Sequence, residues 1–154
     1  MNMNTKHIEM MKVALNEAEK AQKKGEVPIG AVLVADSNQV LAEEHNQTIT
    51  LNDPTAHAEI LALRSAAAQI GNYRLLNTTL YVTVEPCPMC MGAIIHARVT
   101  QVIFGTRDPK WGAAGSLYNF ADDQRFNHQP EIIEGVCKDE CKTLIQSFFR
   151  EKRR

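Results

Sequence analysis

The chain has 154 residues, of which 44% are hydrophobic and 23% charged, and its formal net charge at pH 7 is −1. This composition is typical of one globular domain, here residues 1–154, and it excludes disordered and fibrous proteins. The first residues lack the apolar segment of a secretory signal, and no apolar run reaches membrane-spanning length. We therefore expect a cytoplasmic protein with no membrane partner, whose four cysteines are reduced thiols.

The periodicity of apolar residues predicts alternating helices and strands along the whole chain. The expected elements, in order, are helix 5–24, strands 29–34 and 39–42, helix 54–70, strand 79–84, helix 88–97, strands 101–105 and 131–134, and helix 136–150. The long connection before the last strand is expected to hold a short helix near residues 116–122 and an active-site loop at 106–115. Such a connection favours parallel pairing of the last two strands, since a hairpin needs only a short turn. The prediction is an α/β domain with a five-stranded mixed sheet.

Two of these helices are expected to begin beside residues that bind metals. Pro54 suits a first helical position, with Asp53 or Thr55 as the cap, so His57 falls in an opening turn. Cys87 and Cys90 follow the best strand of the chain and lie within one turn of the next helix. One imidazole and two thiolates fill three positions of tetrahedral zinc and leave the fourth for water, as catalytic zinc requires.

Glu59 follows the first of these ligands by two residues, a spacing that in mid-helix would place the two side chains on different faces. At a helix end both can converge, and we interpret Glu59 as the general acid and base rather than as a ligand. Cys137 and Cys141 lie on one helical stripe with apolar residues and are predicted to be core residues without a metal.

Helix 88–97 has apolar residues on more than one side, which indicates burial either in a subunit interface or in a thick core. The C-terminal segment, residues 150–154, has four positive charges, which would contact RNA or form a solvated end. Asp108, in the expected active-site loop, would either accept a hydrogen bond from a ribose 2′-hydroxyl or hold its own turn before Pro109.

The compound pattern His57-Ala58-Glu59 with Pro86-Cys87-Pro88-Met89-Cys90 resembles the zinc-dependent nucleobase deaminases. Further stretches resemble the bacterial tRNA adenosine deaminase family and cover nearly the whole chain: residues 26–32, 52–60, 72–75, 112–117 and 147–150. The resemblance implies a three-layer α/β/α cytidine-deaminase-like fold. It also implies one Zn²⁺ per chain, a homodimer, and hydrolytic deamination of the wobble adenosine to inosine in the anticodon stem-loop of an arginine tRNA.

The resemblance further implies which residues contact the substrate, although from the sequence alone Asn46 is only a loop asparagine and a role in a turn is favoured. The implied substrate-binding residues are Val27, Asn46, Ala58, Pro86, Asp108, Asn127, Phe149 and Arg150. Two other functions remain open at this point. One is a deaminase of a free nucleobase or nucleoside such as guanine or cytosine, and the other is a non-catalytic zinc-binding module, against which Glu59 argues because a structural site needs no proton shuttle.

Overall fold

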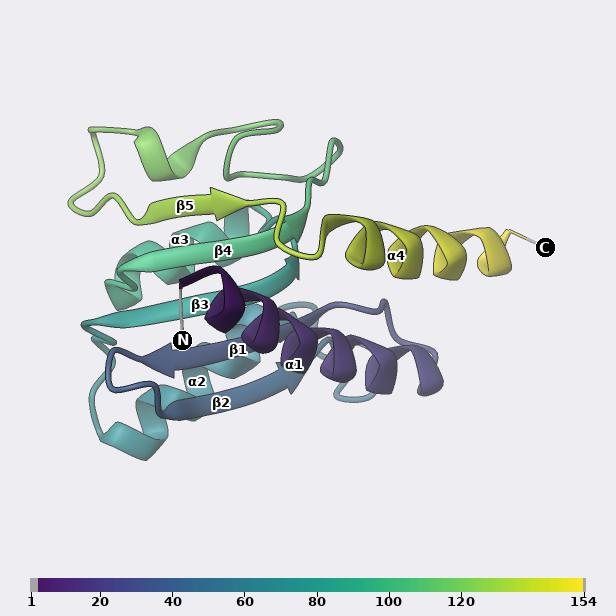
Figure 1. Cartoon of the computed structure of the whole chain (residues 1–154), viewed down its shortest axis with the longest axis horizontal. Coiled ribbons are helices and arrows are strands. Elements are labelled where there is room, and N and C mark those ends of the chain that lie inside the picture. Colours follow the sequence, from purple (N-terminus) through teal and green to yellow (C-terminus); the bar gives the residue numbers. More distant parts are fainter. Residues whose placement is uncertain (1–2, 154) are drawn as a thin grey trace.

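A computed structural model describes residues 3–153, which form a five-stranded sheet between two pairs of helices (Figure 1). The elements are α1 (Met3–Lys23), β1 (Gly30–Ala35), β2 (Val40–His45), α2 (Ala58–Ile70), β3 (Thr78–Val84), α3 (Pro88–Ala97), β4 (Gln101–Thr106), the 3-10 helix η1 (Phe120–Asp122), β5 (Glu131–Glu134) and α4 (Lys138–Lys152). Every long helix and every strand predicted from the sequence is present.

The sheet has the strand order β2-β1-β3-β4-β5. β1 is antiparallel to both of its neighbours, whereas β3, β4 and β5 are parallel, so the predicted parallel pairing of the last two strands is confirmed. Parallel strands have their carboxyl ends at the same edge of a sheet, and this edge is where ligand sites of open α/β sheets lie. Cys87 follows β3 at that edge.

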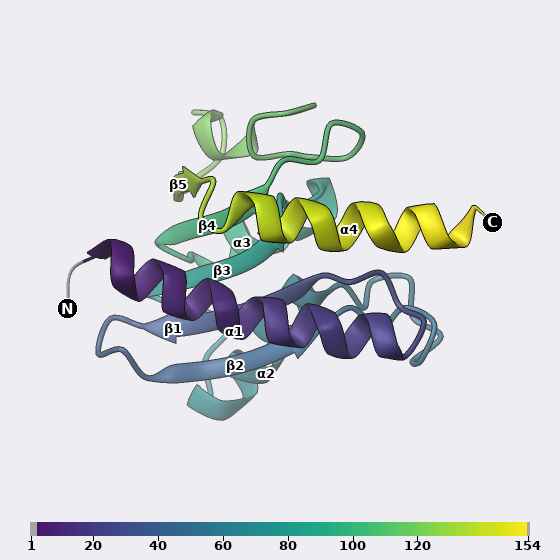
Figure 2. The same ribbon diagram turned by 45° about the vertical axis from the view of Figure 1, so that its right-hand side comes forward.

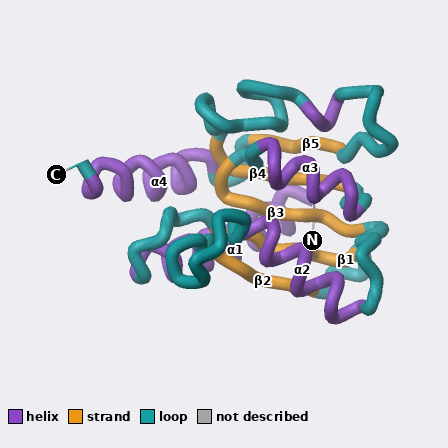
Figure 3. Tube along the Cα trace, turned by 180° about the vertical axis from the view of Figure 1, so that it is seen from behind, coloured by secondary structure: helices purple, strands orange, loops and turns teal. Residues whose placement is uncertain are grey.

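The helices cover both faces of the sheet, which gives the predicted three layers. α1 and α4 lie on one face (Figures 1 and 2), and α2 and α3 lie on the other (Figure 3). Leu80 and Val82 of β3 pack toward α2 and α3, while Tyr81 between them packs toward α1 and α4. Because both faces are buried, the central strands are continuously apolar rather than alternating.

Two glycines allow close packing or a sharp turn that a side chain would oppose. A Cβ on Gly30, at the start of β1, would lie 1.9 Å from the Ala14 carbonyl oxygen, so only glycine lets α1 approach the sheet here. Gly71 ends α2 in the left-handed conformation with φ of 71°, as predicted.

The start of α2 differs from the prediction. The helix begins at Ala58, and Pro54 lies in a turn in which the Asp53 carboxylate accepts hydrogen bonds from the Thr55 N–H and hydroxyl. Asp53 therefore caps a turn and not the helix, because its side chain is used two residues downstream. The short helix expected near residues 116–122 is reduced to the single 3-10 turn of η1. No helix among residues 3–153 is long and apolar enough to cross a membrane.

Candidate active site

The amino ends of α2 and α3 present the three predicted metal ligands. His57 is the N-cap residue of α2 and Cys87 that of α3, both with extended backbones, and Cys90 lies in the first turn of α3. Pro88 occupies the first turn of α3, where its missing N–H costs no hydrogen bond. Two helix dipoles therefore direct their positive ends toward the ligand atoms and favour thiolate over thiol.

The geometry of the three donor atoms fits a tetrahedral zinc ion. The His57 Nδ1 atom lies 3.6 Å from Cys87 Sγ and 3.4 Å from Cys90 Sγ. Zn–N and Zn–S bonds of ordinary length at tetrahedral angles separate nitrogen from sulfur by about 3.6 Å. All three donor atoms lie within 4.8 Å of one another, and no other group of this kind occurs among residues 3–153. Nδ1, rather than Nε2, is therefore the imidazole atom that would bind the metal.

The protonation of the two sulfurs also indicates a cation site. A hydrogen bond with Cys90 lowers the pKa of Cys87 to about 4, and the same interaction together with burial raises the pKa of Cys90. In the absence of a metal these opposite shifts favour one thiolate, at Cys87, over two. A metal cation replaces the remaining proton, since thiolates are the form that binds zinc.

Glu59 lies in the first turn of α2, and its side chain is buried beside the ligand set. Its Oε1 atom is buried and has no hydrogen-bond partner in the described structure. Burial raises the pKa of the Glu59 carboxyl to about 7, against the opposing charge of His57. A buried carboxyl with a free oxygen beside a metal site can accept and return protons, whereas a structural site has no need of one.

A groove lined by basic side chains lies at the carboxyl edge of the sheet; Val84, three residues before Cys87, is part of its lining, whereas His57, Glu59, Cys87 and Cys90 are not. Its volume is about 1520 Å³, and it runs between the loop after β4, residues 107–116, and α4. Six cationic side chains line it against two carboxylates: Arg107, Lys110, Lys138, Lys142, Arg150 and Arg153 against Asp108 and Glu134. The local basic patch that the net charge of the chain does not reveal is therefore present.

Four of the eight implied substrate-binding residues line this groove, namely Val27, Asp108, Phe149 and Arg150. Two others, Ala58 and Pro86, are buried chain neighbours of the ligands His57 and Cys87. Asn46 is buried directly after β2, and its side chain has no hydrogen-bond partner among residues 3–153. Asn127 is exposed outside the groove, ahead of the amino end of β5.

The structure also bears on the two roles considered for Asp108. Its Oδ1 atom accepts hydrogen bonds from the backbone N–H groups of Lys110, at 3.0 Å, and Trp111, at 3.2 Å. Asp108 therefore holds its own turn through one carboxylate oxygen. The other oxygen has no partner in the described part of the chain and remains available to a hydroxyl group.

Several residues of the site were not identified from the sequence. Lys138 and Lys142 extend the basic side of the groove, and their four-residue spacing on a predicted helix is a signal that could have revealed them. Arg107 is paired with Glu134 through two hydrogen bonds of 2.7 and 2.8 Å. Glu85 is buried beneath the loop after β4, and no local pattern indicates its partners, which lie more than twenty residues away.

Comparison with known proteins agrees with the class that the fold and site define. Residues 4–106 match the cytidine and deoxycytidylate deaminase zinc-binding region. The chain is 51% identical over 144 residues to a tRNA-specific adenosine deaminase of Haemophilus influenzae, covering 94% of this chain and 83% of the relative. It is 49% identical to the tRNA-specific adenosine deaminase of Bacillus subtilis, covering 94% and 89%.

A solved structure from studies of A-to-I editing by tRNA:A34 deaminases at the wobble position of transfer RNA superimposes with a TM-score of 0.85. The sequence identity is 43%, and the match covers 88% of this chain and 98% of that one. The chain belongs to the cytidine and deoxycytidylate deaminase family, and within it to the tRNA-specific adenosine deaminases.

Proposed function

We propose that this protein converts adenosine to inosine by hydrolytic deamination at the wobble position of a tRNA anticodon loop. The observation that carries this proposal is the basic groove, with its exposed Trp111 and Phe149, at the same carboxyl edge of the sheet where Cys87 follows β3. Lysines and arginines bind phosphates, and aromatic side chains stack on unpaired bases. A deaminase of free bases needs neither feature, whereas an anticodon loop offers both phosphates and splayed bases.

The three ligands His57, Cys87 and Cys90 would hold one zinc ion per chain, which supplies activation of water at neutral pH. Glu59 accepts one proton from the water that adds to C6 of the adenine and passes it to N1. It then accepts the second proton, from the new C6 hydroxyl, and passes it to the amine as the C6–N bond breaks and the C6 carbonyl forms. The products are inosine and ammonia, and Glu59 ends the cycle in its starting protonation state. Burial of Glu59 matches this role, because a proton shuttle works best when its pKa lies near the working pH.

The proposal also includes the cellular compartment, the oligomeric state, the tRNA and the residues that contact the substrate. The protein acts in the cytoplasm as a homodimer on an arginine tRNA, and Val27, Asn46, Ala58, Pro86, Asp108, Asn127, Phe149 and Arg150 contact the substrate. The relatives named tRNA-specific adenosine deaminase support the choice of tRNA.

Turnover of a synthetic anticodon stem-loop with adenosine at the wobble position tests the proposal directly. The zinc-loaded protein should form inosine in this RNA, and it should be at least about 10³-fold slower on free adenosine, guanine and cytosine, since those lack the phosphate contacts. A stem-loop with the adenosine moved into the paired stem serves as the control. Equal rates on the stem-loop and on a free base would overturn the RNA substrate while leaving the deaminase chemistry intact.

A further inference from the structure

Glu85 is a buried carboxylate that takes no part in the chemistry described above. It directly follows β3 and is 3% exposed, and its backbone N–H donates to the Thr106 carbonyl at the end of β4. A buried carboxylate is costly unless hydrogen-bond donors surround it. The hydrogen-bond donors around Glu85 therefore identify the segment of the chain that its carboxylate holds in place.

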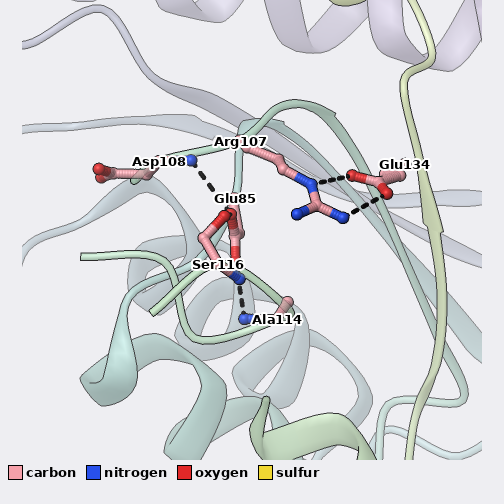
Figure 4. A network of polar contacts seen from close by, with 6 residues as sticks. All are labelled: Glu85, Arg107, Asp108, Ala114, Ser116 and Glu134. Carbon is pink, nitrogen blue, oxygen red and sulfur yellow. Dashed lines mark hydrogen bonds and ion pairs between the residues drawn. The ribbon is translucent and has the colours of Figure 1, made fainter. Parts of the chain in front are cut away.

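All of the donors to this carboxylate that the described structure shows come from one loop (Figure 4). The Asp108 N–H donates to Oε1 at 3.1 Å, and the Ala114 and Ser116 N–H groups donate to Oε2 at 2.9 and 3.0 Å. The Ser116 hydroxyl donates to Oε1 as well. Both ends of the loop at residues 108–116 are thus attached to one side chain, and hydrogen bonds to a charged acceptor are stronger than those between neutral groups.

The middle of the loop lies directly on the same carboxylate. A Cβ on Gly112 would lie 2.3 Å from Glu85 Cδ and 2.5 Å from the Asp108 carbonyl oxygen, so no other residue fits there without displacing the loop. The next residue, Ala113, donates its N–H to the Pro86 carbonyl at 2.8 Å. The loop is therefore built onto the segment 85–86, which is continuous with the metal ligand Cys87.

Some side chains of loop 108–116 line the groove and lie on the side of the loop away from Glu85. Asp108 points its carboxylate away from Glu85 in Figure 4, and Trp111, 65% exposed, lines the groove with it. We propose that Glu85 is a positioning residue that fixes loop 108–116 to the metal-ligand segment and so places Asp108 and Trp111 for RNA. This assignment rests on the proposed function, because it names the way in which the same site is held ready for its substrate.

Release of this loop is expected to weaken RNA binding and to change the rate of the chemical step only slightly. If the loop is released, RNA must select the minority of molecules in which the loop has the correct conformation, and the apparent dissociation constant rises by the inverse of that fraction. Loss of the carboxylate should therefore raise KM for the stem-loop by about tenfold while kcat changes by less than about threefold. The zinc ligands are unaffected by this change.

Two variants disturb the contact between Glu85 and the loop, one at the carboxylate and the other at Gly112. Glu85→Gln replaces one acceptor oxygen by an amide that faces the donors, and Gly112→Ala inserts a methyl group where the carboxylate lies. Ser116→Ala removes one donor of the set and should give a smaller effect in the same direction. Glu131→Gln is the matched control, because Glu131 is an exposed carboxylate outside the groove that accepts a single hydrogen bond, from Gln101.

Trp111 is the only tryptophan in the chain, so its fluorescence reports on this loop without any substrate. In Glu85→Gln and in Gly112→Ala, steady-state anisotropy of Trp111 should fall and acrylamide quenching should rise, with zinc content unchanged and the tenfold increase in KM. In Glu131→Gln all four quantities should equal those of the unmodified protein. Unchanged anisotropy and KM in both loop variants, or loss of zinc together with RNA binding in both, would overturn the positioning role. The fluorescence result stands even if the stem-loop is not the substrate, so the two failures are distinguishable.

Discussion

The side chains of His57 and Glu59 lie at the same site because the two residues have different backbone conformations. In a regular helix, residues two positions apart would point in different directions. His57 is extended, with φ of −72° and ψ of 153°, whereas Glu59 is already within the first turn of α2. In mid-helix the two side chains would diverge by roughly 200°. The change of conformation at the N-cap lets the imidazole and the carboxylate converge, as the proposed roles of metal ligand and proton shuttle require.

Replacement of Glu59 by Gln should therefore abolish turnover without loss of metal. The three ligands remain, and a buried amide of the same shape cannot exchange protons, so kcat should fall by about 10²–10⁴-fold. Inosine formation under single-turnover conditions and zinc content measured on the same preparation check this. A variant that keeps zinc and deaminates at near the original rate would exclude Glu59 as the acid and base.

The two C-terminal cysteines should be irrelevant to zinc. Cys141 is buried in the core between α4 and the sheet, and Cys137 is the N-cap of α4, so neither belongs to the ligand cluster. The double variant Cys137→Ser, Cys141→Ser should still bind about one zinc per chain, as a site with three protein ligands implies. Its melting temperature should fall, because a hydroxyl would replace the buried Cys141 thiol. Metal analysis showing less than half an equivalent would contradict the ligand set.

Among the elements, the carboxyl ends of β4 and β5 are joined by an ion pair that restrains one of the groove cations. Arg107 donates two hydrogen bonds to Glu134, and this pairing lowers the pKa of the Glu134 carboxyl. Both side chains are half-exposed and line the groove, so an RNA phosphate competes with Glu134 for the same guanidinium. In the proposed complex the carboxylate would oppose RNA binding twice, by occupying Arg107 and by repelling phosphate.

Glu134→Gln should increase affinity for the anticodon stem-loop by about two- to fivefold at low salt and steepen the log–log salt dependence by about 0.7, the value of one added phosphate contact. Titrations at several salt concentrations measure both quantities. In Arg107→Gln the substitution at Glu134 should have a much smaller effect. If Glu134→Gln weakens binding, Glu134 contributes to recognition and does not oppose it.

How far the sequence predicts the elements depends on whether the relevant signals are local. Pro88 at a helix start, and the β-branched run that ends before Cys87, identify α3 and β3 to within a residue. The start of α2 was predicted too early because Asp53 satisfies a turn, a competing use of the same side chain that only the structure reveals. His57, Cys87 and Cys90 could be predicted to lie together because helix starts fix them locally, and the structure brings their donor atoms together. The attachment of Glu85 to Ser116 depends on packing between distant segments, for which no local pattern exists.

For the whole molecule, the net charge of −1 does not reveal that positive charge is concentrated in one groove. Six cations line one groove, and one of them, Arg107, is already paired with Glu134. RNA binding should thus depend steeply on salt, with a log–log slope of about −3 to −4 if the five remaining cations each contact a phosphate of a single strand.

Two double variants that each remove two positive charges distinguish the effect of the groove from the effect of total charge. Arg150→Gln with Arg153→Gln removes two of the groove charges, and the salt slope should flatten by up to about 1.4. Lys6→Gln with Lys12→Gln removes two charges from α1, outside the groove, and should leave the slope within error. Equal changes in the two variants would mean that total charge, and not the groove, governs RNA binding.

The last helix extends well beyond the sheet, and its groove-lining residues recur every three or four positions from Lys138 to Arg153 (Figures 1 and 2). These side chains therefore share a face because of helical phase, not because of contacts with the sheet. One residue removed near Ser147 would leave every charge in place but turn the remainder of the helix by about 100°. Phe149 and Arg153 would then take the positions of Phe148 and Lys152, which do not line the groove, and Arg150 would take that of Phe149. For the proposed RNA contacts, the number of residues in α4 is thus as strict a requirement as the identity of its basic residues.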